Sequence, residues 1–117
     1  MLIGNSNSVN KKLVDEISKI YPITFVDATN FVEHPLEVNS SLPRIIIVNL
    51  MDVASNERDL FALIKNTYPD RKLLGLHCFK SQNMIQNVLD SGYDGYLSIF
   101  DFSNEFSEII NKLGVLV

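Results

Sequence analysis

The chain has 117 residues, the length of one domain, so we expect a single domain over residues 1–117. Hydrophobic residues make up 46% of the chain and charged residues 21%, an ordinary globular balance that argues against wholesale disorder. The formal net charge of −4 disfavours direct binding to nucleic acid, because phosphate groups require clustered cations.

The chain begins with a pattern of strand, polar loop and helix. Residues 1–4 predict a short strand, and the polar residues 5–8 offer several helix N-caps. A helix is expected next, because apolar residues recur at helical spacing until Pro22: Val9, Leu13, Ile17 and Ile20.

Two further strands are predicted before residue 51, with a poorly patterned segment between them. Residues 23–26 predict the second strand, and Pro35 opens a short predicted helix over residues 34–39. Residues 44–50 predict the third strand. It contains a continuous β-branched run, which is typical of a strand covered on both faces.

The second half of the chain alternates helices and strands. A helix is expected over residues 55–68, followed by a strand over 72–78. Ser81 is the expected N-cap of the next helix, and Gly92 lies where a left-handed residue ends such a helix. A strand over 95–99 precedes a last helix, which we expect to be capped by Ser103 and to end at Gly114.

This strict alternation predicts an α/β fold with a parallel sheet and helices on both faces. Five strands in this length match the flavodoxin-like, doubly wound arrangement with strand order 2-1-3-4-5. Ligands of such folds bind at the carboxyl ends of the strands, beside the switch point between strands one and three. The residues expected at that edge are Asn5, Ser6, Asn49, Leu50, Met51, Asp52, His77 and Ile99.

The single cysteine, Cys78, excludes an internal disulfide framework and a zinc site built from cysteines, and it suits a reducing compartment. The N-terminus lacks the apolar run of a signal peptide. No apolar run approaches the ~20 residues that a membrane-spanning helix needs. We therefore expect a cytoplasmic protein that does not contact membranes.

Three stretches of the chain resemble the receiver domain of bacterial two-component response regulators. Residues 92–100, GYDGYLSIF, are similar to the family's G-A-D-G-Y-L-x-K-P run. Residues 44–52, RIIIVNLMD, resemble the strand that ends in the phosphorylated aspartate, and residues 68–70, YPD, are also typical. The resemblance covers the whole chain and implies the receiver fold.

The chain departs from the family at all five side chains of its phosphorylation site. The family has two acids that bind Mg²⁺, a phosphorylated aspartate, a hydroxyl residue and a lysine. The corresponding positions here are Asn5 and Ser6, Asn49, His77 and Ile99, in that order.

These departures are mutually consistent. A neutral amide is a poor nucleophile, so Asn49 does not form an acyl phosphate. Mg²⁺ usually takes one or two carboxylates, and Asn5, Ser6 and Asn49 offer neutral oxygens only. Without those carboxylates a buried lysine would cost ~3–5 kcal/mol, which Ile99 avoids. The resemblance therefore implies a degenerate receiver with no cofactor, no metal and no catalytic residue.

Several individual residues have more than one interpretation. Asn49 fits a hydrogen-bonded structural amide, and His77 fits either a neighbour of that amide or a pH switch. Residues 5–8 fit helix caps or a phosphate-binding loop. Asp27, Asp52 and Asp101 belong to the same edge, and Asp52 in particular is open as an alternative phosphorylation or cation site. Cys78 is expected to be inert.

In the family, the fourth helix, fifth strand and fifth helix form a face that binds partners. In this chain that face would carry Tyr93, Tyr96, Phe100 and Phe102. Aromatic residues are enriched in interfaces, and they are equally common in cores. The resemblance thus implies an unidentified protein partner or a homodimer through this face, with the aromatic residues as interface or as core.

Three functions follow, in decreasing order of support. The first is a phosphorylation-independent signalling module that works by protein–protein interaction and is not an enzyme. The second is the regulatory N-terminal domain of a DNA-binding transcription regulator, whose effector domain would follow residue 117. The third is a flavin- or nucleotide-binding protein, which the absence of glycine from residues 5–8 disfavours.

Overall fold

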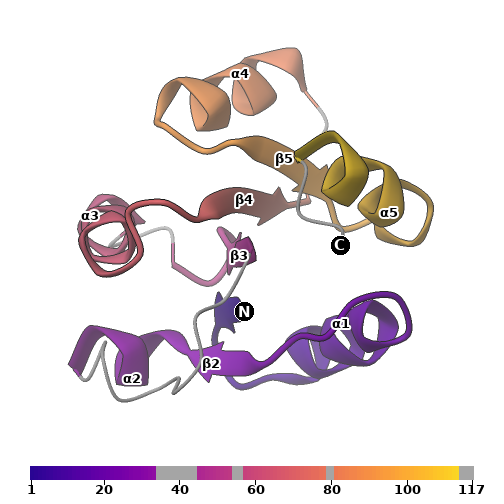
Figure 1. Cartoon of the computed structure of the whole chain (residues 1–117), viewed down its shortest axis with the longest axis horizontal. Helices are drawn as coiled ribbons and strands as arrows, with labels where there is room; N and C mark the ends of the chain where they lie inside the picture. Colours follow the sequence, from indigo (N-terminus) through magenta and orange to yellow (C-terminus); the bar gives the residue numbers. More distant parts are fainter. Residues whose placement is uncertain (34–44, 54–56, 79–80, 114–117) are drawn as a thin grey trace.

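In the computed structural model of the protein, five parallel strands form one sheet in the order β2-β1-β3-β4-β5 (Figure 1). The structure describes residues 1–33, 45–53, 57–78 and 81–113. The strands are β1 (Leu2–Gly4), β2 (Phe25–Asp27), β3 (Ile45–Asn49), β4 (Lys72–His77) and β5 (Gly95–Ser98). The doubly wound order expected from the sequence is confirmed.

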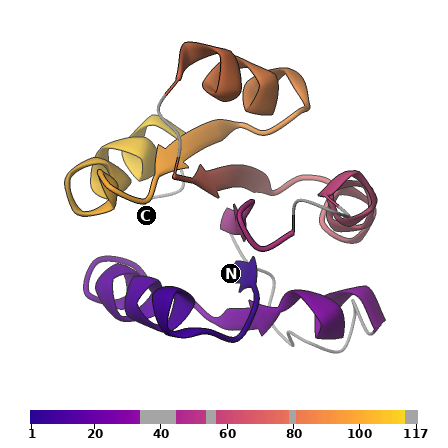
Figure 2. The same cartoon turned by 180° about the vertical axis from the view of Figure 1, so that it is seen from behind.

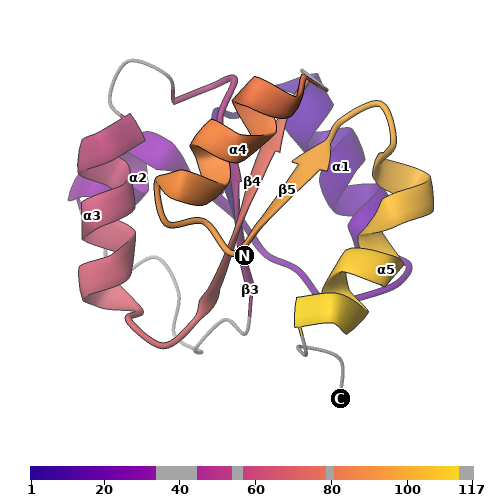
Figure 3. The same cartoon turned by 90° about the horizontal axis from the view of Figure 1, so that it is seen from above.

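In the described part of the chain, five helices cover the two faces of the sheet (Figures 1 and 3). They are α1 (Ser8–Ser18), α2 (Ala28–Glu33), α3 (Glu57–Thr67), α4 (Gln82–Asp90) and α5 (Phe102–Leu113). Helices α1 and α5 lie side by side on one face, which the view from behind also shows (Figure 2). Helices α2, α3 and α4 cover the other face. None of the helices in the described ranges has the length and apolarity that a membrane crossing requires.

The core has two layers, one on each face of the sheet. Ile17 of α1 and Phe106 of α5 pack against Ile45 and Ile47 of β3 on one face. Phe31, Leu60 and Val88 pack on the other face, against the alternate residues of β3. All five residues of β3 are therefore buried, as the continuous β-branched run indicates.

Helix α1 uses a different apolar stripe from the one expected. Its buried residues are Asn10, Leu13 and Ile17, whereas Val9 and Ile20 are each nearly half exposed. The expected stripe is therefore wrong at both ends. As a result of this orientation of α1, the polar side chain of Asn10 is buried at the amino end of the helix.

Helix α2 lies where no element was expected, while the short helix predicted over residues 34–39 lies outside the described residues. Asp27 starts α2, because its Oδ1 accepts hydrogen bonds from the backbone N–H groups of Thr29 (3.0 Å) and Asn30 (3.4 Å). Ala28 and Phe31 are buried one turn apart. With six residues, the helix is too short to show a periodic pattern.

The helix ends expected from the sequence are confirmed at three positions, and one of them is wrong. Asn7 and Ser81 are the N-caps of α1 and α4 and accept from the N–H groups three residues later. Gly92 follows α4 with φ 111°, as expected. Helix α5 begins at Phe102, so Ser103 as its N-cap is wrong.

We expect Gly92→Ala to lower the free energy of unfolding by about 1–3 kcal/mol, measured by urea denaturation. A Cβ at this position would lie 2.6 Å from Cζ of Phe61, and the positive φ is strained for any L side chain. Asn83→Ala, on the exposed face of α4, is the control and should change stability by less than about 0.5 kcal/mol. Equal losses of stability in Gly92→Ala and Asn83→Ala would show that position 92 does not require glycine.

Candidate functional site

The switch point of the sheet is occupied by a hydrogen-bonded group of four residues, which we call the amide network: Asn5, Asn10, Asn49 and Asp52. Asn5 follows β1, Asn49 ends β3, and Asp52 lies in the turn after β3. Asn10 comes from the first turn of α1. The strand order places β1 beside β3, and their carboxyl ends therefore bring these residues together.

The side chains of Asn10 and Asn49 are each 1% exposed, and their polar groups are bonded to one another. Asn49 Nδ2 donates to Asn10 Oδ1 at 2.7 Å. Asn10 Nδ2 donates to Asp52 Oδ2 at 2.7 Å and to the carbonyl oxygen of Asn5 at 2.6 Å. The N–H of Met51 donates to Asn49 Oδ1 at 3.1 Å. Each side-chain nitrogen and oxygen of the two buried amides therefore has a partner within the protein.

The carboxylate of Asp52 fixes the direction of this network. An ionised carboxylate only accepts hydrogen bonds, so the NH₂ group of Asn10 must face it. The Oδ1 of Asn10 then faces Asn49, which must present its own NH₂ group. Asp52 Oδ2 also accepts from the backbone N–H of Asn5 at 3.0 Å, which ties the loop after β1 to the turn after β3.

Gly4 makes this close approach possible. A Cβ added to it would lie 2.6 Å from Asn10 Nδ2 and 2.8 Å from Asp52 Oδ2. Any side chain at this position would therefore displace the hydrogen bond between those two atoms. The requirement is for space, since Gly4 does not have a positive φ.

Ser6 lies outside the amide network. Its hydroxyl donates to Asp27 Oδ2 at 3.2 Å, and Asp27 also starts α2. Both Asn5 and Ser6 are exposed, and Asn5 contributes only its backbone to the network. The two positions that correspond to the family's acid pair are thus directed to different partners.

His77 ends β4 and Ile99 directly follows β5, and the N–H of Ile99 donates to the carbonyl of His77 at 3.0 Å. The His77 Nδ1 accepts from the N–H of Cys78 at 2.8 Å and lies 3.5 Å from its sulfur. Burial lowers the pKa of His77 below its usual range. Ile99 packs against the core layer beneath α1 and α5.

The remaining residues expected at this edge are mainly structural. Leu50 is buried in the core, and its N–H donates to Leu76. Met51 contributes its N–H to Asn49. Asp101 is half-buried, and its carbonyl accepts from Glu105 in the first turn of α5.

The aromatic residues of the expected interface divide into two groups. Tyr93 and Phe102 are each 4% exposed, so of the two interpretations left open for them, interface or core, the structure places both in the core. The Tyr93 hydroxyl bonds to Glu57, and burial together with that carboxylate raises the pKa of Tyr93. Tyr96 is half-buried, and Phe100 is 75% exposed.

Asn10, the central residue of the network, is not among the residues predicted for this edge from the sequence. A signal was present, because positions 10, 13 and 17 follow helical spacing and two of them are apolar. The polar residue at position 10 of this stripe indicates a buried amide that needs a hydrogen-bond partner. The expected apolar stripe began at Val9, so it did not include position 10.

The donor set at this edge does not fit Mg²⁺. Magnesium requires octahedral oxygen ligands with carboxylates among them, and the one carboxylate of the network already accepts from Asn5 and Asn10. The amide oxygens of Asn10 and Asn49 are likewise engaged with hydrogen-bond donors. Within the described part of the chain, no three His, Cys, Asp or Glu side chains form a group that could hold a metal ion.

The fold of this chain is similar to that of a response regulator. A solved structure of RcsB from Salmonella typhimurium, a response regulator described for its conformational dynamism in DNA interaction, superposes with a TM-score of 0.73 at 13% sequence identity. The superposition covers 97% of this chain and 57% of the RcsB chain, so this chain spans little more than half of that length. Neither a protein-family model nor a curated protein matches the sequence. The similarity establishes a receiver-like fold.

We expect Asn10→Leu to lower the free energy of unfolding by about 1–3 kcal/mol in urea denaturation, because it leaves Asn49 and Asp52 without a buried partner. Asn66→Leu, an exposed position on α3, is the matched control and should change stability by less than about 0.5 kcal/mol. In a cycle with Asn49→Leu the two losses should be non-additive by at least about 0.5 kcal/mol. Additive losses would show that the two amides are not coupled.

We also expect His77 to make the fold less stable in acid. Its folded-state pKa is below the unfolded value, so the unfolded chain binds the proton more readily. Stability therefore falls as the pH drops through about 6.5 towards the folded-state pKa. His77→Asn should remove this part of the pH dependence in urea denaturation at pH 7.5 and 5.5. An equal loss of stability between pH 7.5 and 5.5 in the wild type and in His77→Asn would contradict this role of His77.

Proposed function

We propose that this chain is a degenerate receiver domain that acts as a phosphorylation-independent module for protein–protein interaction in signal transduction. The observation that carries the proposal is the amide network. The position where the resembling family has its phosphorylated aspartate holds a buried amide, and both of its polar atoms are bonded within the protein. An acyl phosphate requires a free carboxylate nucleophile at that place.

Asp52 is a structural acceptor in this proposal and does not replace the lost phosphoacceptor. Its Oδ2 takes two donors that come from the loop after β1 and from α1. Phosphorylation at that oxygen would break both hydrogen bonds. It would thereby separate the turn after β3 from the loop after β1 and from α1. The lysine of the resembling family would have no carboxylate cluster to face, in keeping with Ile99 at that position.

The proposed module works through its surface, without a cofactor, metal or catalytic residue of its own. Phe100 and Tyr96 are the aromatic residues of the predicted partner face that reach the surface. The partner would be a protein or a second copy bound through α4, β5 and α5. We propose a single cytoplasmic domain over residues 1–117, without direct contact to nucleic acid or membrane.

A second candidate is the regulatory domain of a DNA-binding transcription regulator. RcsB is described in terms of DNA interaction, and its chain extends well beyond the part that superposes on this protein. In that case DNA binding would lie in an appended domain, and the sequence of the gene beyond residue 117 decides the question.

We expect the wild-type chain to show no localised amide shifts in ¹⁵N-HSQC spectra when beryllofluoride and Mg²⁺ are added. Beryllofluoride mimics an acyl phosphate and needs a free carboxylate. Shifts around residue 49 would overturn the proposal. If such shifts appeared in the wild type and were absent in Asp52→Asn, they would also overturn the proposal, because they would identify Asp52 as the phosphoacceptor. Asp70→Asn, an exposed acid outside this edge, is the control.

Restoring the carboxylate alone should not restore phosphorylation. Asn49→Asp places a second acceptor-only group opposite Asn10 Oδ1, so we expect a loss of about 1–3 kcal/mol at pH 7. Part of this loss should be recovered in acid, where the new carboxyl is protonated and donates to Asn10. A stable variant that takes up phosphate from acetyl phosphate would contradict this expectation.

A further inference from the structure

We propose that the pocket between α1 and β2 binds a free α-amino acid with an aromatic side chain. The pocket has a volume of about 450 Å³, within the range of ~300–1,000 Å³ that is usual for small-molecule sites. Its lining combines an apolar wall with a lysine and an aspartate. This inference goes beyond the proposed function, because it adds a small-molecule ligand to a module that is proposed to bind a protein.

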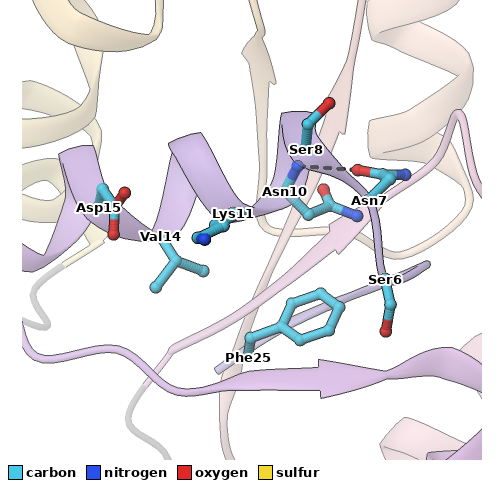
Figure 4. A pocket seen from close by; sticks show the side chains of 8 residues that line it. All are labelled: Ser6, Asn7, Ser8, Asn10, Lys11, Val14, Asp15 and Phe25. Atoms are coloured by element: carbon cyan, nitrogen blue, oxygen red, sulfur yellow. Dashed lines mark hydrogen bonds between the residues drawn. The ribbon is translucent and has the colours of Figure 1, made fainter.

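The apolar wall of the pocket comes from two elements at the edge of the sheet (Figure 4). Phe25 lies on β2, an edge strand, and Val14 lies on α1. Both side chains are half-buried, because they pack against the core layer beneath α1 and α5 and still border the pocket. An aromatic ring that enters from solvent can stack on the exposed part of the Phe25 ring in the offset geometry that ring pairs prefer. The wall therefore favours a ligand with an aromatic group.

Lys11 and Asp15 bring opposite charges to the same pocket. They are four residues apart on α1, so they lie on one face of the helix, ~6 Å apart along its axis. Side chains at this spacing commonly form an ion pair. In the described part of the chain, however, the one ion pair joins Lys19 and Glu16, so Lys11 and Asp15 do not pair with each other. Both are exposed, and a ligand can therefore engage a cation and an anion at once.

A free α-amino acid carries the two complementary charges on one carbon atom. Its carboxylate would accept from Lys11 Nζ, and its ammonium would donate to the carboxylate of Asp15. The flexible lysine side chain allows both charge-assisted hydrogen bonds to form within one helical turn. A purely anionic or purely cationic ligand would meet one like charge in this pocket, and a residue inside a peptide chain has neither main-chain charge. The pair of charges therefore selects a zwitterion.

The remaining walls of the pocket are fixed by hydrogen bonds within the protein. Asn7 Oδ1 accepts from the backbone N–H of Asn10 at 2.9 Å (Figure 4). The hydroxyl of Ser6 donates to Asp27 Oδ2 at 3.2 Å, and the side chain of Asn10 is held in the amide network. Ser6, Asn7 and Asn10 all border the pocket. Binding would therefore order mainly the two charged side chains, which keeps its entropic cost low.

Titration of the ¹⁵N-labelled 117-residue chain with L-phenylalanine up to about 10 mM, which covers millimolar affinity, tests the proposal. We expect HSQC shifts concentrated at the residues that border the pocket, and none with glycine, which lacks an apolar side chain. Lys11→Gln and Asp15→Asn should each weaken binding about two- to fivefold, the effect of losing an exposed ion pair. Lys12→Gln, at an exposed lysine outside the pocket lining, is the matched control and should bind like the wild type.

The decisive measurement combines each variant with a ligand that lacks one charge. L-Phenylalaninamide lacks the carboxylate and N-acetyl-L-phenylalanine lacks the ammonium, so each should bind the wild type at least about twofold more weakly than L-phenylalanine. The amide should bind Lys11→Gln no more weakly than the wild type, and the acetyl compound should bind Asp15→Asn no more weakly. An absence of shifts with L-phenylalanine, equal binding of the three ligands, or a further loss in either combination overturns the inference. The proposed function is tested separately, by the response to beryllofluoride.

Discussion

The hydrogen bond between Asn10 and the carboxylate of Asp52 sets the arrangement of the whole switch point. Asp52 can only accept, so it orients Asn10, and Asn10 in turn orients Asn49. The same carboxylate accepts from the backbone of Asn5 and connects the loops that follow β1 and β3. This carboxylate, the carbonyl of Asn5 and the N–H of Met51 together determine the direction of the side-chain bonds of Asn10 and Asn49.

The amide network keeps its hydrogen bonds within the protein. At the edge of the sheet where doubly wound folds usually bind ligands, the buried side chains of Asn10 and Asn49 have their partners within the protein. Buried polar networks that are fully satisfied tend to make a region rigid. Phe100, which follows the carboxyl end of β5 at the same edge, is 75% exposed. In the proposed module, partners would therefore bind at exposed side chains and not in the buried interior of this edge.

The sequence was sufficient for the fold and only partly sufficient for the site. Alternation of elements predicts the strand order, because short crossovers and parallel pairing leave few other topologies. The helical stripe of α1 was misplaced because Val9 is apolar but exposed, while Asn10 is polar but buried. Helix α2 depends on Asp27 and on two buried residues, which is too little for a periodic signal. Tyr93 and Phe102 could not be assigned to core or surface without the packing itself.

The brevity of the edge strands limits the ways in which copies of this chain can meet. Strand β2 has three residues and β5 has four, so each edge presents few unpaired backbone groups. Short edges of this kind protect a sheet against edge-to-edge pairing, which is the first step of many aggregates. Any self-association must then be made by side chains, and side-chain contacts are selective and reversible where continuous backbone pairing is neither.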